Sequence, residues 1–161
     1  MAACFKIMGK LQKDCGKKGK VMSRREVREH VFKMLFGVEF FEEKELEEQM
    51  ELYFEQALDD EIPNPPSFIS EENREYLKKR VKAVAEKVPQ IDESINAVAT
   101  GWKTGRMGKA DLSILRLAVY EMKYDDEIPV SVAINEAVEL AKKFGSEESP
   151  SFVNGILAKL V

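Results

Sequence analysis

The segment over residues 112–122 constrains the fold of this chain more than any other. Its apolar residues leave almost no polar face, and they are Leu112, Ile114, Leu115, Leu117, Ala118, Val119 and Met122. An α-helix that is apolar on every side is stable in water only when other elements surround it. We therefore expect a central helix here, with several further helices packed around it.

The first of those helices is expected to begin at Ser23. Ser23 and Glu26 have the spacing of a capping box, in which the hydroxyl accepts a hydrogen bond from the Glu26 amide and the carboxylate accepts one from the Ser23 amide. Apolar residues then recur at helical spacing, at Val27, Val31, Met34, Leu35, Val38 and Phe41. Residues 1–22 are rich in lysine and glycine and are expected to form a disordered basic tail.

Helical periodicity also predicts helices over residues 44–59, 70–88, 91–101, 130–144 and 149–160. Pro89 is expected to separate the 70–88 helix from the 91–101 helix, because proline lacks an amide donor and clashes with the preceding turn. Ser70 and Ser149 are expected to cap the helices that follow them, and Gly145 is expected to end the 130–144 helix in a left-handed conformation.

No segment has the alternating pattern that is typical of β-strands. The sequence therefore predicts an all-α fold of about seven helices. We expect a single domain over residues 23–161, built from two packed helical subdomains of about 23–88 and 89–161 that share one core.

The basic residues are concentrated at the start of the chain, although the whole protein is acidic, with 25 basic and 29 acidic residues. The first 28 residues hold nine lysines and arginines against Asp14 and Glu26, a net charge of +7, so the remainder carries −11. This division separates a region that can meet phosphates from a body that repels them. It favours a polyanionic partner at the N-terminal end.

Motifs and composition argue against several function classes. The sequence has no P-loop, GxSxG or HExxH motif, so we expect neither an enzyme nor a bound cofactor. No zinc site is expected, because His30 is the only histidine, no CxxC pair is present, and Cys4 and Cys15 read as free thiols. Two carboxylate clusters, over 59–61 and 125–127, are interpreted as solvated helix ends. No apolar run approaches the roughly 20 residues of a membrane span, and a cytoplasmic location is the expectation.

Three arginines are unusual for their place. Arg24, Arg25 and Arg28 lie in the first turns of the helix that begins at Ser23, where positive charge opposes the helix dipole. Each exposed charge there costs about 0.3–1 kcal/mol at low salt. Two interpretations stay open: a solvated turn, or a set of guanidinium groups that contact phosphates.

The turn between the last two predicted helices is flanked by Phe144 and Phe152. Both side chains could anchor the core. Alternatively, one could be exposed and stack on an unpaired base, as aromatic residues do in readers of single-stranded RNA.

These same segments resemble a known family. Residues 128–145 read IPVSVAINEAVELAKKFG and residues 152–157 read FVNGIL, which together strongly resemble the C-terminal signature of the bacterial NusB transcription antitermination factors. Residues 115–122, LRLAVYEM, look like the preceding helix of that family, and residues 24–29, RREVRE, resemble its arginine-rich N-terminal helix. The likeness runs from Ser23 to the C-terminus and is most specific over 111–157.

The resemblance implies an all-helical fold of two small bundles and a non-enzymatic factor. Such a factor pairs with NusE, a small-subunit ribosomal protein, binds the boxA element of ribosomal RNA transcripts, and acts in the antitermination complex of RNA polymerase. By position it implies RNA-binding roles for Arg24, Arg25, Arg28, Phe36, Phe144, Glu148 and Phe152. It implies a NusE contact at Asp111, and it leaves a homodimer open.

Two other functions stay open at this point. One is the NusB-like RNA-binding accessory domain of an rRNA cytosine methyltransferase. The other is a helical adaptor that binds protein only, for which NusE binding would not depend on RNA.

Overall fold

The computed structural model describes residues 21–37, 43–55 and 69–161, and these residues form six α-helices and one short 3-10 helix, with no strand among them. The predicted all-α fold is confirmed. The elements are α2 (Arg24–Gly37), α3 (Glu43–Glu55), α4 (Glu71–Val98), η2 (Thr104–Arg106), α5 (Lys109–Tyr124), α6 (Val130–Phe144) and α7 (Ser149–Ala158). Some of the predictions concern residues outside the described ranges. These are the tail over 1–20, Cys4 and Cys15, Val38 and Phe41, and the 59–61 cluster.

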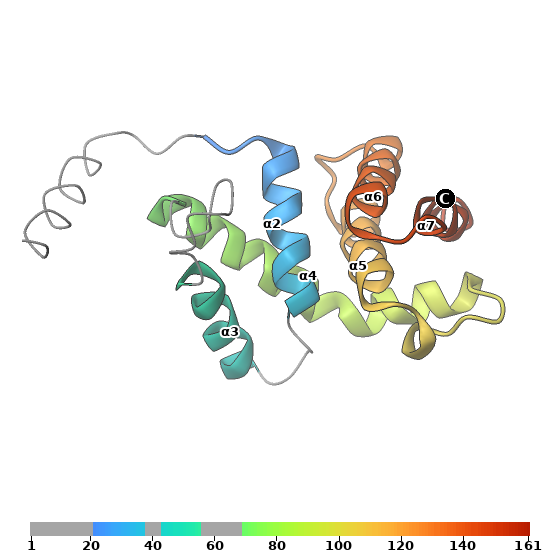
Figure 1. Cartoon of the computed structure of the whole chain (residues 1–161), viewed down its shortest axis with the longest axis horizontal. Helices are drawn as coiled ribbons and strands as arrows, with labels where there is room; N and C mark the ends of the chain where they lie inside the picture. Colours follow the sequence, from blue (N-terminus) through green and yellow to red (C-terminus); the bar gives the residue numbers. More distant parts are fainter. Residues whose placement is uncertain (1–20, 38–42, 56–68) are drawn as a thin grey trace, which may run out of the picture.

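Helix α5 is the centre of the fold, as its all-round apolar surface predicts. It packs against α2, α4, α6 and α7 (Figure 1). Ile114, Leu115 and Val119 are completely buried, and Leu117 and Ala118 nearly so. Burying a large aliphatic side chain contributes about 1.5–3 kcal/mol. The contacts of α5 therefore hold α2, α4, α6 and α7 on one core.

The capping box predicted at the start of α2 and the cap predicted at the start of α4 are both present. The Ser23 amide donates to Glu26 Oε2 at 2.8 Å, and the Glu26 amide donates to Ser23 Oγ at 3.2 Å. At α4, the Asn73 amide donates to Ser70 Oγ at 3.4 Å. The box at Ser23 fixes the first turn of α2, and with it the direction of the arginines in that turn.

The predicted break at Pro89 is wrong, because α4 continues through this proline. Leu77, Val81 and Val84 before Pro89 and Ile91 and Ile95 after it are all fully buried. Their burial outweighs the roughly 3 kcal/mol that a proline costs inside a helix. Figure 1 shows α4 running past α3, α2 and α5, so the predicted subdomain boundary at 88/89 falls inside one helix.

The turn between α6 and α7 brings the backbone of Gly145 close to Ser149 and Ala141. Gly145 has φ −93° and ψ −172°, which is extended backbone, so the predicted left-handed conformation is wrong. A Cβ at Gly145 would lie 2.5 Å from Ser149 Cβ and 2.8 Å from the Ala141 carbonyl oxygen, so close approach is what requires glycine here.

Ser149 is also placed differently from the prediction. It is the first residue of α7, and its Oγ accepts a hydrogen bond from the Ser146 amide at 2.9 Å. The hydroxyl therefore closes the preceding turn instead of capping the helix that follows. This compact turn fixes the positions of Phe144 and Phe152 relative to each other.

No helix within the described parts of the chain is long and apolar enough to cross a membrane.

Replacing Pro89 with alanine is expected to stabilise the protein. The proline side chain is exposed, so its loss removes no packing. Proline is about 3 kcal/mol less favourable than alanine inside a helix, so the free energy of unfolding should rise by up to about that amount. Urea unfolding of Pro89→Ala should show a higher midpoint with an unchanged slope. An unchanged or lower urea midpoint would contradict this prediction, because proline would then not destabilise α4.

Candidate nucleic-acid interface

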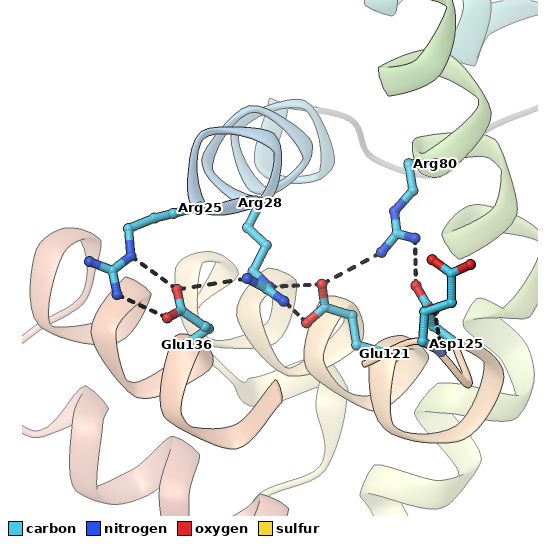
Figure 2. A network of polar contacts seen from close by, with 7 residues as sticks. Arg25, Arg28, Arg80, Glu121, Asp125 and Glu136 are labelled. Atoms are coloured by element: carbon cyan, nitrogen blue, oxygen red, sulfur yellow. Dashed lines mark hydrogen bonds and ion pairs between the residues drawn. The ribbon is translucent and has the colours of Figure 1, made fainter. Parts of the chain in front are cut away.

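A chain of ion pairs joins four parts of the fold beside the first turn of α2 (Figure 2). Its members, in the order of their contacts, are Arg25, Glu136, Arg28, Glu121, Arg80 and Asp125. The first two arginines come from α2 and the third from α4. The carboxylates come from α5, from α6 and from the residue that follows α5.

The buried centre of this chain is the pair of Arg28 and Glu121. Arg28 Nε donates to both carboxylate oxygens, at 2.9 and 3.0 Å, and the two side chains are only 7% and 2% exposed. Arg80 Nη2 lies 3.6 Å from Glu121 Oε1. Burial raises the pKa of the Glu121 carboxyl, and the charge of Arg28 and its hydrogen bonds oppose that rise. The charged form of Glu121 thus depends on its arginine partners.

The other end of the Arg80 guanidinium is paired with a carboxylate as well. Arg80 Nη1 donates to Asp125 Oδ2 at 2.5 Å. Asp125 belongs to the 125–127 cluster that was interpreted as a solvated helix end, and for this residue the interpretation is wrong, because it is half-buried against α4.

The exposed end of the chain is the pair of Arg25 and Glu136. Arg25 Nη2 donates to Glu136 Oε1 at 2.9 Å, and Arg25 Nε donates to Oε2 at 3.2 Å. The Arg25 side chain is 65% exposed. Its hydrogen bond lowers the pKa of Glu136, and Arg28, with Nη1 at 3.8 Å, adds to the effect. Arg25 is thus a solvent-facing cation whose guanidinium is held in one orientation.

The three arginines of the first turns therefore have different surroundings. Arg24 and Arg25 are exposed, whereas Arg28 is buried and faces α5. In this arrangement the Arg28 side chain is 7% exposed and lies between Glu121 and Glu136, which argues against the direct RNA contact that the resemblance implies for it. Its partner Glu121 is 93 residues away in sequence, which is why the local pattern did not distinguish Arg28 from its neighbours.

A row of aromatic rings extends from α2 to the end of α6. The rings of Phe36 and Phe32 have centroids 6.1 Å apart, and those of Phe32 and Phe144 are 4.9 Å apart. Phe36 is 48% exposed, Phe32 is buried, and Phe144 and Phe152 are half-buried against the core. Both rings thus anchor the core, and base stacking by their remaining exposed area stays a prediction. Glu148 is exposed at the start of α7.

Several charged residues near these rings were missed at the sequence level. Lys33 Nζ and Lys143 Nζ lie 5.8 and 5.3 Å from the centroid of the Phe144 ring. Lys143 Nζ also donates to both carboxylate oxygens of Glu29, at 2.8 Å each. The spacing of Glu29 and Lys33 on one helix face was a readable signal, whereas the pairing of Glu29 with Lys143 spans 114 residues and was not.

Asp111 lies apart from the arginine turn. It is in the first turn of α5, ten residues before Glu121, which corresponds to about 15 Å along the helix. Its Oδ1 is buried and has no hydrogen-bond partner within the described residues. The acidic position and the basic turn thus belong to separate surfaces of the fold.

Comparison with known proteins shows the family of this chain. Residues 25–161 match the family model described as the NusB family. The chain belongs to the NusB family. A transcription antitermination protein NusB from Agathobacter rectalis is 54% identical over 138 residues, which cover 86% of this chain and 98% of the relative. The corresponding protein of Lachnoclostridium phytofermentans is 51% identical over 140 residues, 87% of this chain and 99% of the relative.

Solved structures share the fold. T. maritima NusB matches with a TM-score of 0.67 and 34% identity, over 86% of this chain and 90% of that one. A crystal structure of the antitermination factors NusB and NusE in complex with dsRNA matches with a TM-score of 0.61 and 25% identity, over 85% of this chain and 94% of that one. The predicted class, a NusB-type transcription antitermination factor and not an enzyme, is confirmed.

Replacing Arg28 alone is expected to be costly, and replacing it together with Glu121 is not. Arg28→Met leaves Glu121 buried with only the distant Arg80, and breaking such a pair costs about 3–5 kcal/mol. The double variant Arg28→Met/Glu121→Met removes both charges, while Arg80 keeps Asp125 and Glu136 keeps Arg25. Its unfolding free energy should be close to that of the wild type.

The pH dependence separates this explanation from a simple loss of packing. In Arg28→Met the unpaired Glu121 has a raised folded-state pKa, so it favours the folded state when protonated and opposes it when charged. The destabilisation should therefore be largest near neutral pH and shrink as the pH falls toward the ordinary glutamate pKa. A loss of unfolding free energy that is the same at pH 7 and at pH 5 would contradict this explanation.

Proposed function

We propose that this chain binds the boxA RNA of ribosomal RNA transcripts together with NusE. The observation that carries the proposal is the exposed, oriented guanidinium of Arg25 on the capped first turn of α2, with the aromatic row of Phe36, Phe32 and Phe144 further along the same helix and at the end of α6. Cations beside exposed rings suit an RNA in which phosphates and unpaired bases are both accessible.

The residues divide this work by their chemistry. Arg24 and Arg25 contact phosphates, because planar guanidinium groups bind them with paired hydrogen bonds. Phe36, Phe144 and Phe152 stack on bases with their exposed area. Glu148 would repel a phosphate, so it accepts a hydrogen bond from a base amino group instead.

Arg28 supports the surface from beneath. Its pair with Glu121 holds α2 against α5, and Arg28 together with Arg25 holds Glu136 on α6. The RNA thus depends on Arg28 through the placement of α2, without touching it.

The NusE contact lies at the other end of α5, at Asp111. Asp111 lies in the first turn of α5, about 15 Å along the helix from Glu121, so a protein contact there leaves the RNA surface free. The solved complex of NusB and NusE with dsRNA supports a protein surface and an RNA surface on one fold. We place the pair in an RNA polymerase antitermination complex in the cytoplasm, and a homodimer of this chain would be a separate, RNA-free state.

Removing both exposed arginines is expected to weaken RNA binding and its salt dependence. Arg24→Gln/Arg25→Gln loses two phosphate contacts, so the slope of log K against log salt should fall in magnitude by about 1.4 for single-stranded RNA. The measurement is a boxA RNA titration of the complex with NusE at several salt concentrations. Arg28 is left intact, because its replacement tests stability first.

The control is Lys79→Gln/Lys82→Gln, which removes the same charge from α4 and should leave the slope unchanged. Equal binding by the arginine variant and the wild type would contradict the proposal. NusE binding with no RNA binding at all would instead favour the protein-only adaptor.

A further inference from the structure

Three cations on the proposed RNA surface are already paired with carboxylates of the same protein. Across the face formed by α2 and α6, the three pairs are Arg25 with Glu136, Lys142 with Glu139, and Lys143 with Glu29. All six side chains line one open hollow between the two helices. A phosphate that binds here must therefore compete with a carboxylate for each cation.

The pair of Glu29 and Lys143 is placed where this competition matters most. Both oxygens of Glu29 accept a hydrogen bond from Lys143 Nζ, at 2.8 Å each. Glu29 is 22% exposed and Lys143 is 57% exposed, so the carboxylate is the fixed member and the long lysine the movable one. Lys143 Nζ also lies 5.3 Å from the centroid of the Phe144 ring.

The position of Lys143 beside Phe144 relates the ion pair to base stacking. The Lys143 ammonium lies over the Phe144 ring, so a base that approaches this ring brings the phosphates of its own nucleotide within reach of the ammonium. Lys33 Nζ, 5.8 Å from the same ring, is a second ammonium within this region. The Glu29 carboxylate occupies the Lys143 donors that such a phosphate would use.

Resting on the proposed RNA function, we propose that Glu29 sets the RNA affinity of this surface by holding Lys143, and that single-stranded RNA binds by taking Lys143 from Glu29 with a phosphate. Exposed ion pairs are weak, so a phosphate can displace the carboxylate. An arbitrary polyanion gains little from an ammonium that is already neutralised. An RNA that also stacks on Phe144 and reaches Arg25 gains enough to make the exchange, so Glu29 favours that RNA over others.

The experiment is a titration of boxA RNA with the NusE complex of the wild type and of Glu29→Gln, over a range of salt concentrations. Glu29→Gln frees Lys143 and should tighten binding by up to about five-fold. The slope of log K against log salt should increase in magnitude by about 0.7, because the contact of Lys143 with a phosphate then leaves no freed Glu29 carboxylate to take up a cation. Binding of an unrelated single-stranded RNA should tighten by a larger factor.

The matched control is Glu51→Gln. Glu51, like Glu29, is a glutamate paired with a lysine, Lys78, but this pair lies on α3 and α4, outside the hollow. It removes the same charge, so it reports the effect of net charge alone, and it should change affinity and slope little. Equal tightening by Glu51→Gln and Glu29→Gln would overturn the proposal.

A double-mutant cycle tests whether the effect passes through Lys143. Lys143→Gln should weaken binding, and Glu29→Gln/Lys143→Gln should bind no more tightly than Lys143→Gln. A gain that persists without Lys143 would overturn the proposal, as would unchanged binding by Glu29→Gln. Urea midpoints of each variant show that the fold is retained.

The two levels of proposal fail in different ways. If Arg24→Gln/Arg25→Gln loses RNA binding while Glu29→Gln is unchanged, the role of Glu29 is wrong and the RNA surface stands. If neither variant changes binding, the RNA surface itself is wrong.

Discussion

The buried ion pair of Arg28 and Glu121 determines how the rest of this structure is arranged. It joins α2 to α5, the helix against which α2, α4, α6 and α7 all pack. Two charges this deeply buried are tolerated only when their hydrogen-bonding groups are satisfied, and Arg80 and Glu136 extend the network on either side. The angle and position of α2 are therefore fixed by a polar contact in the core as well as by apolar packing.

This arrangement gives one helix several functions. The capping box at Ser23 and Glu26 fixes where α2 begins, and the pair with Glu121 fixes which side faces α5. The exposed side then presents Arg25, while the side toward α6 presents Glu29 to Lys143 and places Phe32 against Phe144. A change in the rotation of α2 would disturb the cations and the aromatic row together.

The local features of this fold could be predicted from sequence, and the long-range ones could not. The all-round apolar 112–122 segment and the capping box at Ser23 are determined within a few turns, and both predictions are confirmed. The break at Pro89 failed because burial of residues on both sides, such as Val84 and Ile91, outweighs the local cost of proline. The sequence located the arginine turn, but partners 93 to 114 residues away decide which of its charges face solvent and which cations are already paired.

The most direct test of the account is RNA binding by the stable double variant Arg28→Met/Glu121→Met, in complex with NusE, measured over a range of salt concentrations. If Arg28 acts only by holding α2 in place, and the two packed methionines hold α2 equally well, this variant should bind boxA RNA with the affinity and the salt slope of the wild type. A folded variant whose binding is weaker and whose slope is smaller in magnitude by about 0.7 would contradict the account, because Arg28 would then be a phosphate contact.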